Sequence, residues 1–392
     1  MNCLIDPRKL VRFDFGPLHP FKTYRLGLTY NLMEAYGLTS ATSVYTLEPR
    51  EATQEEAQSF HTEGYLEVLR LADTGMWVPN LFSHGLGTGD NPVFPGVYEW
   101  GMLVAGASID CAKEILADRA KIAFNMSGGL HHAMPSQASG FCHVNDVVLA
   151  INALLADEKR IAYVDIDAHH GDGVQHAFYT TDRVLTISIH QSGHTIFPGS
   201  GFVDEIGQEA GRGYAVNVPL LPGAGDDVYQ LVSSDVVRPF LDAYNPDILV
   251  TQLGADALRG DRVAGLGMSL RQFERFAIFF HELKKPWLAL GGGGYDVGNV
   301  VRAWTLAWAR MNNTTLPDKI PQEWLTQAAT YGVTTMTLRG KDAGEPSSAR
   351  VFKDLDRTLR ALKETVFPLI VSHQHSATSR QLKANQSSDA EC

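Results

Sequence analysis

Short hydrophobic segments recur along the chain and indicate buried β-strands. Apolar and β-branched residues fill five runs continuously rather than in alternation, namely 121–127, 160–167, 183–190, 247–254 and 286–294. Continuous apolar runs of this length are typical of strands that are buried on both faces of a parallel sheet. The pattern therefore predicts a parallel sheet that is covered on both sides.

Longer segments with helical spacing lie between these runs. The clearest are 98–117, 228–244 and 269–285, where apolar residues recur every three or four positions. Strands that alternate with helices predict an α/β doubly wound fold. No internal repeat and no Pro- or Ser-rich linker separates these segments, so we expect one domain over residues 1–371. Residues 372–392 are polar and aperiodic, which predicts a disordered tail.

Composition narrows the class of protein. The chain has 392 residues, 44% of them hydrophobic, which suffices for a large buried core. A net charge of −11 argues against binding nucleic acid without sequence preference. The cysteines form no CxxC pair. Charged residues interrupt the N-terminal segment, which does not fit a secretory signal. No apolar run approaches the roughly 20 residues of a membrane span. We therefore expect a cytoplasmic protein with neither nucleic acid nor membrane as partner.

Residues that can bind metals or carry protons follow directly after the predicted strands. The four sequences are GGLHHAM (128–134), DAHHGDG (167–173), GADA (254–257) and GGYD (293–296). Ligands of parallel α/β sheets bind outside the carboxyl ends of the strands. We therefore expect these four loops to converge on one site.

Three residues near the end of the second strand have a spacing that suits metal ligands. Asp165, Asp167 and His169 occupy alternate positions, so their side chains leave on one face if the strand stays extended. Asp167 and His169 could then share a metal with Asp256, which follows another strand. Three protein ligands and one open position describe catalytic zinc. Because two carboxylates offset the charge of the metal, we expect a separate base. The alternative is that these carboxylates only cap helices.

The adjacent His131 and His132 are candidates for that base, since neutral histidine is a common general base near pH 7. Asp165 and Asp172 could each accept an imidazole N–H and fix the tautomer of one ring. Tyr295 follows four glycines at the end of the last strand and could stabilise an oxyanion. The alternatives are structural histidines and a tyrosine in a flexible turn.

Three further features carry less chemistry. The glycine-rich segments 84–91 and 291–294 do not satisfy the dinucleotide-binding fingerprint, and the first reads as a loop that carries Asp90. Cys142 could act as a nucleophile, but beside a metal and two histidines a buried thiol is the interpretation that we favour. His61 lies in an amphipathic segment, and we expect no chemistry of it.

Taken together, these motifs resemble those of the zinc-dependent histone deacetylases and the bacterial acetoin-utilisation-type deacetylases. Five stretches occur in the order found in that family: SGGLHHAMPSQASGFCHVND, YVDIDAHHGDGVQHAF, IFPGSG, QLGADALRGD and GGGGY. The similarity extends from HPFKTYRLGL to the helix after Gly294, about three quarters of the chain. The resemblance implies an arginase-like single α/β domain whose central, mostly parallel sheet has about eight strands flanked by helices.

The resemblance also implies roles for individual residues. Asp167, His169 and Asp256 would bind one zinc ion, His132 would be general base and acid, and His131 its electrostatic partner. The other implied residues are Asp165 and Asp172 behind the histidines, Tyr295 at the scissile carbonyl, Asp90 at the rim, and Gly140, Phe141, Phe197 and Gly293 along the substrate channel. One potassium ion would be bound by Asp165, Asp167, His169, Ser188 and Ile189, and a second by Phe178, Thr181, Val184 and Tyr214.

Two departures from the family pattern concern substrate and branch. Met134 and Pro135 stand where nuclear members usually have two lysines, which favours the bacterial branch. Val263 is smaller than the residue usual at the channel mouth, which bears on substrate preference.

The implied function is zinc-dependent hydrolysis of the amide of N6-acetyl-lysine in proteins, with release of acetate. Acetylated proteins would be the partners. The alternatives are an amidohydrolase of acetylpolyamines or other small molecules, a manganese ureohydrolase, which would need a second metal site, and a non-catalytic acyl-lysine binder. Such a binder would be expected to lack Tyr295 or one of the paired histidines, and all three residues are present.

Overall fold

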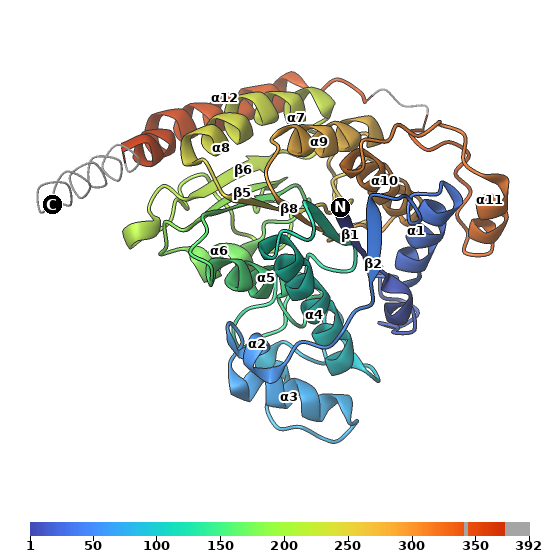
Figure 1. The fold of residues 1–392 in the computed structure, drawn as a ribbon. Coiled ribbons are helices and arrows are strands. Elements are labelled where there is room, and N and C mark those ends of the chain that lie inside the picture. The colour runs from blue at the N-terminus through green and yellow to red at the C-terminus, as the bar shows by residue number, and fades with distance from the viewer. Residues whose placement is uncertain (341–343, 373–392) are drawn as a thin grey trace, which may run out of the picture.

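The computed structural model describes residues 1–340 and 344–372, and these form a single α/β domain (Figure 1). Its centre is an eight-stranded sheet in which all strands are parallel, in the order β2-β1-β3-β8-β7-β4-β5-β6. The predicted fold class is therefore confirmed. The strands are β1 (Asn2–Ile5), β2 (Val44–Leu47), β3 (Ile122–Asn125), β4 (Ile161–Asp165), β5 (Val184–Gln191), β6 (Ala215–Leu220), β7 (Ile248–Gln252) and β8 (Trp287–Leu290).

All five strands that the hydrophobic runs predict are present, but four of them end earlier than expected. The runs 121–127, 160–167, 247–254 and 286–294 correspond to β3, β4, β7 and β8, which stop two to four residues before the ends of the runs. After each of these strands the backbone leaves the ladder of sheet hydrogen bonds and turns into a loop. These loops carry the residues with candidate chemistry.

Helices cover both faces of the sheet (Figure 1). Helices α5 and α6, with the second half of α4, close one hydrophobic core, and α1, α9, α10 and α12 close the other. The longer helices are α1 (Tyr24–Ala35), α3 (Glu63–Asp73), α4 (Val97–Leu116), α5 (Asp146–Leu155), α9 (Leu270–Glu282), α10 (Val297–Met311) and α12 (Ala349–Ala361). The shorter ones are α2 (Gln54–Gln58), α6 (Asp172–Phe178), α7 (Asp226–Val232), α8 (Arg238–Tyr244) and α11 (Gln322–Ala329).

The helix expected over 228–244 is interrupted, whereas 98–117 and 269–285 form α4 and α9 as predicted. Between α7 and α8 lies one π-helical turn, Ser233–Val237. The physical reason is Pro239, which has no N–H to donate to the carbonyl four residues before it. The backbone widens by one residue just before the proline and then continues as α8.

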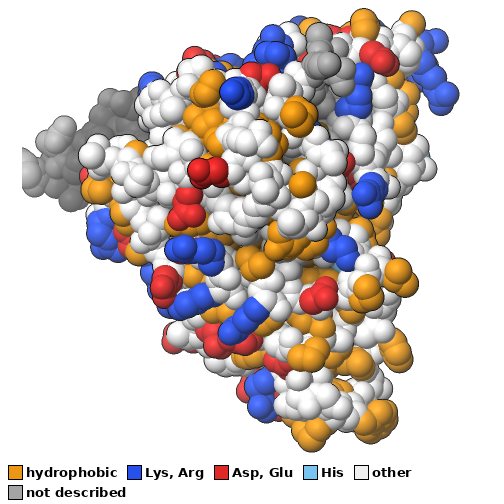
Figure 2. Space-filling model, turned by 90° about the vertical axis from the view of Figure 1, so that its right-hand side faces the viewer, with side chains coloured by type: hydrophobic (Ala, Val, Ile, Leu, Met, Phe, Trp, Pro, Cys, Tyr) orange, Lys and Arg blue, Asp and Glu red, His pale blue; other side chains and the backbone are white. Residues whose placement is uncertain are grey.

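The surface mixes charges of both signs. Figure 2 shows Lys and Arg side chains interspersed with Asp and Glu on the face that it presents. Among the helices in the described residues, none has the length and hydropathy needed to cross a membrane. Residues 373–392, which hold nearly all of the predicted tail, lie outside the described residues.

Candidate metal centre and catalytic pocket

The order of the strands explains why distant segments meet. Strands β3, β8, β7 and β4 are consecutive neighbours in the sheet. The four loops identified in the sequence follow these four strands, so they leave from adjacent positions along one edge. The structure therefore brings together residues that are more than 160 positions apart, from His131 to Tyr295.

The loop after β4 differs from the extended strand that we expected. Strand β4 ends at Asp165, and the next residues form bends. Carboxylates shape this loop, because the Asp167 N–H donates to Asp165 Oδ1 at 3.0 Å and the His169 N–H donates to Asp167 Oδ1 at 2.9 Å. The side chains are thus placed by these local hydrogen bonds rather than by the pleat of a strand.

Asp167, His169 and Asp256 converge on one point. His169 Nδ1 lies 3.1 Å from Asp167 Oδ1 and 3.0 Å from Asp256 Oδ2. One ligand atom from each residue lies within 4.8 Å of the others, and all three side chains are buried. Two carboxylates and one imidazole with this spacing fit a zinc ion that keeps an open position.

Two glycines make room for these carboxylates. A Cβ atom on Gly254 would lie 2.1 Å from Asp167 Oδ2, and a Cβ atom on Gly293 would lie 2.1 Å from Asp256 Oδ2. Any larger residue would collide with a candidate ligand. The Gly293 N–H also donates to Asp167 Oδ2 at 2.8 Å, so Gly293 supports the metal centre rather than only lining the channel.

The electrostatics of this centre call for a cation. Burial, together with the charge of Asp167, raises the pKa of Asp256 to about 7. Burial also tends to lower the pKa of His169, but the carboxylates outweigh it and raise that pKa to about 10. No Lys or Arg in the described residues bonds to the four site aspartates, by which we mean Asp165, Asp167, Asp172 and Asp256. A divalent ion would balance this negative charge.

The paired histidines face one another, each with an aspartate behind it. His131 Nδ1 lies 2.7 Å from Asp165 Oδ2, and His132 Nδ1 lies 2.7 Å from Asp172 Oδ1. The two Nε2 atoms are 3.0 Å apart. Since a carboxylate only accepts, both Nδ1 atoms carry protons, and one Nε2 donates to the other.

The pKa values of the two rings shift in opposite directions. Burial lowers the pKa of His131, but the charges of Asp165 and Asp167 outweigh it and raise that pKa to about 9. Burial and the neighbouring His131 lower the pKa of His132 to about 4. At neutral pH His131 is therefore charged and donates from Nε2, and His132 is neutral and accepts that hydrogen bond with the lone pair of its own Nε2.

Aromatic and glycine residues line the entrance to this centre. The narrow pocket includes Tyr295, Phe141, Gly140 and both histidines. The Phe141 ring meets Tyr295 edge-on with centroids 5.6 Å apart, and Phe197 meets His132 edge-on at 5.0 Å. A Cβ atom on Gly140 would lie 2.5 Å from the His132 ring, so the backbone there approaches the histidine as only glycine permits.

Tyr295 is available as a hydrogen-bond donor. Burial and the charges of Asp256 and Asp167 raise its pKa well above the ordinary value, so the phenol keeps its proton. Among the described residues its hydroxyl has no hydrogen-bond partner, whereas its backbone N–H donates to Asp261 Oδ2 at 2.7 Å. Cys142 lines the same pocket, but burial raises the pKa of its thiol well above the ordinary value, which does not favour a nucleophile.

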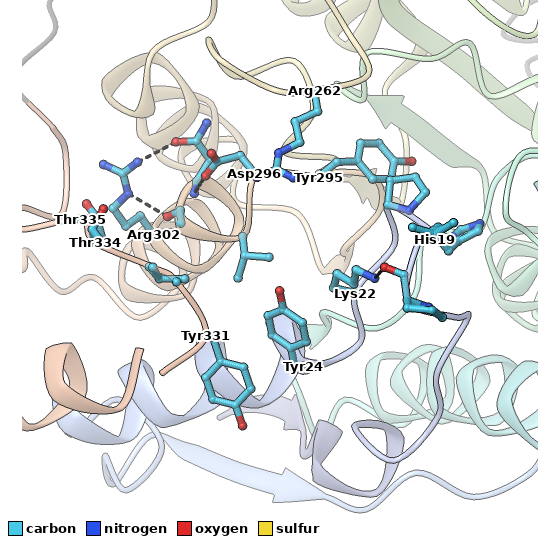
Figure 3. Close-up of a pocket in the computed structure, with 18 of the residues that line it drawn as sticks. His19, Lys22, Tyr24, Arg262, Tyr295, Asp296, Arg302, Tyr331, Thr334 and Thr335 are labelled. Atoms are coloured by element: carbon cyan, nitrogen blue, oxygen red, sulfur yellow. Dashed lines mark hydrogen bonds between the residues drawn. The ribbon is translucent and has the colours of Figure 1, made fainter. Parts of the chain in front are cut away.

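A second, wider cavity of about 660 Å³ lies beside the narrow pocket and shares Tyr295 with it. Figure 3 shows Tyr295 and His19 on one side of this cavity and Arg302 and Tyr331 on the other. Asp90 lines neither pocket. It lies on the neighbouring loop, where its backbone oxygen is 3.2 Å from His19 Nε2.

The residues of the two expected potassium sites lie at opposite ends of β5. Ser188 is the register partner of Asp165 on β4, and Ile189 follows it toward the carboxyl end. The second set surrounds the amino ends of β5 and β6 and consists of Phe178, Thr181, Val184 and Tyr214.

Sequence reasoning missed several residues that hold the site in place. The Tyr163 hydroxyl donates to Asp165 Oδ2 at 2.6 Å, and Gln252 Nε2 donates to Asp167 Oδ2 at 2.7 Å. The buried Asp146 accepts the Leu130 N–H at 2.8 Å and thereby holds the histidine loop. Tyr163 was detectable, because it precedes Asp165 by two residues on the same strand face. His61 accepts the Asn145 N–H at 2.9 Å.

Comparison with known proteins adds independent information. The family model described as "Histone deacetylase domain" matches residues 19–311. Histone deacetylase B of Dictyostelium discoideum is 41% identical over 322 residues, which are 81% of this chain and 75% of that protein. Histone deacetylase 9 of Arabidopsis thaliana is 41% identical over 311 residues, 79% of this chain and 72% of that protein. Type-1 histone deacetylase 1 of D. discoideum is 39% identical over 310 residues, 78% of this chain and 62% of that protein.

Proposed function

The chain belongs to the histone deacetylase family, and from this premise we propose that it is a zinc-dependent hydrolase that removes acetyl groups from lysine side chains of proteins. The observation that carries the proposal is the convergence of Asp167, His169 and Asp256 next to a pair of histidines with separated pKa values. Amide hydrolysis needs a group that polarises the carbonyl and a base that accepts a proton from water, and a metal site with an adjacent neutral histidine can supply both.

The donor set fits one zinc ion, which when bound would polarise the acetyl carbonyl and acidify a water molecule. His132 Nε2, which accepts from His131 Nε2 in the resting site, would exchange that partner for the attacking water and take up a proton as the water oxygen bonds to the carbonyl carbon. Asp172 holds the ring and stabilises the imidazolium that forms. His132 then gives the proton to the departing lysine nitrogen as the C–N bond breaks, and acetate and a free amine result.

Tyr295 and His131 support this proton transfer from two sides. The phenol of Tyr295 donates a hydrogen bond to the carbonyl oxygen, which gains negative charge during the attack. The positive charge of His131 keeps His132 neutral between turnovers, because two adjacent imidazolium rings would repel each other. Phe141 and Phe197 would flank the apolar stem of the acetylated lysine.

Two of the alternatives make different demands on the site. A manganese ureohydrolase needs a second metal site, and within the described residues one group of three potential ligands, Asp167, His169 and Asp256, converges closely enough to hold a metal ion. A non-catalytic binder has no use for a base and a phenol at the reacting bond. An amidohydrolase of acetylpolyamines would use the same chemistry, so substrate has to be tested directly.

The experiment compares acetyl-lysine peptides, longer acyl-lysine peptides and acetylpolyamines as substrates of the purified protein. We expect the highest kcat/KM for an acetyl-lysine peptide. The free Asp90 carboxylate at the rim can accept peptide N–H groups, which a polyamine lacks. Asp90→Ala should therefore lower activity on the peptide about tenfold and affect a minimal acetyl-lysine amide much less. Faster hydrolysis of acetylputrescine or acetylspermidine than of any peptide would overturn the protein-substrate proposal.

Three finer assignments belong to the same proposal. Potassium ions would occupy the sites named above, and the pairing of Ser188 with Asp165 across two strands supports the first of these sites. A place in the bacterial branch and a cytoplasmic location are proposed from the sequence alone.

A further inference from the structure

Two buried histidines bond to the backbone of the loop that carries Asp90, residues 87–92, which we call the rim loop. His19 Nε2 lies 3.2 Å from the backbone oxygen of Asp90, and His143 Nε2 lies 3.1 Å from the backbone oxygen of Pro92. Both rings are buried, and so is Asn91, which lies between the two carbonyls. The two histidines therefore bond to the rim loop on both sides of the buried Asn91.

The hydrogen bonds around each ring fix its tautomer. His19 Nδ1 accepts the Phe21 N–H at 3.1 Å, so the ring proton is on Nε2 and points at the Asp90 carbonyl. His143 also needs a proton on Nε2 to bond to a carbonyl. Burial lowers the pKa of His19 and lowers that of His143 to about 4. At neutral pH both rings are neutral and serve as N–H donors.

The loop itself leaves the Asp90 side chain free. The Gly87 N–H donates to the Asn91 carbonyl at 2.9 Å, and the Asn91 N–H donates to Thr88 Oγ1 at 3.0 Å. Within the described part of the chain, the exposed Asp90 carboxylate has neither a hydrogen bond nor an ion pair. The backbone is thus fixed and the carboxylate is available.

His19 also joins this loop to the channel wall. Its ring meets Phe141 edge-on with centroids 4.5 Å apart, and Phe141 in turn meets Tyr295. Figure 3 shows His19 and Tyr295 among the residues that line the wider cavity. The position of Asp90 is therefore tied to the channel that would hold the lysine stem.

We propose that His19 and His143 are positioning residues that form a clamp under the rim loop and set the preference for peptides over small acetylated amines. The clamp fixes Asp90 before the substrate arrives, so binding does not have to order the loop. This inference rests on the proposed function, because it concerns how the same site selects its substrate.

A double-mutant cycle tests the clamp. His19→Phe keeps an aromatic ring but removes the N–H donor, and it is made both in the parent and in Asp90→Ala. The readout is the ratio of two kcat/KM values, that for an N6-acetyl-lysine peptide divided by that for N6-acetyl-lysine amide. We expect His19→Phe to lower this ratio about fivefold in the parent, mainly through the KM of the peptide. In Asp90→Ala it should change the ratio no further, because neither substrate then uses the carboxylate.

Conservative and matched variants separate positioning from general damage. His19→Gln restores a side-chain N–H donor and should recover most of the ratio, and His143→Phe should lower the ratio in the same direction as His19→Phe. Tyr244→Phe is the control, because it removes a buried hydroxyl that bonds to the Asp182 carbonyl at 3.1 Å near the amino ends of the strands. It should leave the ratio unchanged.

Amide hydrogen exchange provides a readout that does not depend on activity. Exchange in segment 87–92 should accelerate in His19→Phe and not in Tyr244→Phe. Equal losses on both substrates, the same loss in the Asp90→Ala background, or unchanged exchange would each overturn the clamp. A parent that hydrolyses neither substrate would instead contradict the proposed function, while the exchange measurement would still decide on the clamp.

Discussion

Two groups of buried charged residues differ in how their charges are balanced. On α9, the Glu274 carboxylate accepts from Arg310 Nε and Arg339 Nε, each at 2.7 Å. In this Glu274 cluster every buried charge has an opposite partner from the chain itself. Within the described residues, the four site aspartates accept hydrogen bonds only from histidine, tyrosine and glutamine side chains and from backbone N–H groups, and from no guanidinium or ammonium group.

This difference separates residues that serve stability from residues that serve function. A buried carboxylate that is paired with guanidinium groups is complete without any ligand. Buried carboxylates that outnumber the charged histidines beside them and bond to no guanidinium group are costly, and they persist where a bound ion offsets the cost. An imbalance of buried charge therefore points to the site, whereas the number of charges alone does not.

The largest loss of activity is expected when one of the site aspartates is removed. Asp256→Ala removes one candidate ligand, so we expect loss of the metal and of all measurable activity. The parent should contain one zinc ion per chain by elemental analysis, and chelation should lower its unfolding midpoint. Asp256→Ala should lack zinc and should not respond to the chelator. Two catalytic metals per parent chain would favour the ureohydrolase alternative.

His132→Ala tests the base without touching the ligand set. It should lower kcat about 10³-fold, because proton transfer from water and to the leaving nitrogen would lose its carrier. Zinc content and circular dichroism should match the parent. A variant that keeps zinc and more than about a tenth of the activity would exclude His132 as the main base.

Tyr295→Phe is a smaller change at the same site, since it removes one hydroxyl and keeps the ring that meets Phe141. Loss of one donor to a developing oxyanion costs roughly 10²–10³ in turnover. The loss should appear in kcat on an acetyl-lysine peptide, with the zinc retained. Near-normal turnover would show that the phenol does not act on the carbonyl.

The sequence predicted the central strands and the residues at their ends for the same reason. Strands buried on both faces are continuously apolar, so the change to polar residues after β3, β4, β7 and β8 was visible. Strands β2 and β6 lie at the edges of the sheet, and β2 carries an exposed threonine. Neither forms a continuous apolar run, and both were missed. Strand β1 lies inside the sheet but was missed as well, because it has only three apolar residues, between Asn2 and Asp6.

The supporting contacts of the site were harder to predict, because they join residues far apart in the sequence. Gln252 bonds to Asp167 from another strand, 85 residues away, and His143 reaches Pro92 across 51 residues. A glutamine in a strand or a histidine in a loop has no pattern of its own. Only the order of the strands and the packing of the loops reveal such partners.

The smallest effect on turnover is expected from the Glu274 cluster, although its effect on stability should be clear. Glu274→Gln leaves two guanidinium groups facing a neutral amide, which should lower the free energy of unfolding by about 2 kcal/mol. Glu67→Gln, in the exposed pair with Arg70 on α3, is the control and should not change the unfolding midpoint measurably. Turnover of an acetyl-lysine peptide should remain at the parent level in both variants.

The difference in the free energy of unfolding between the parent and Glu274→Gln should depend on pH in a defined direction. Burial would raise the pKa of Glu274, but the hydrogen bond from Arg339 and the two guanidinium charges outweigh it and lower that pKa below its ordinary value of 4.5. The ionised carboxylate therefore stabilises the fold fully above about pH 4.5, and this contribution is lost as the pH falls through the lower folded-state pKa. Denaturant unfolding of the parent and Glu274→Gln should show a constant difference between pH 7 and about pH 5 and a shrinking one in more acidic buffer. If Glu274→Gln instead lowered turnover as much as Tyr295→Phe does, balanced and unbalanced charge would no longer separate stability from function.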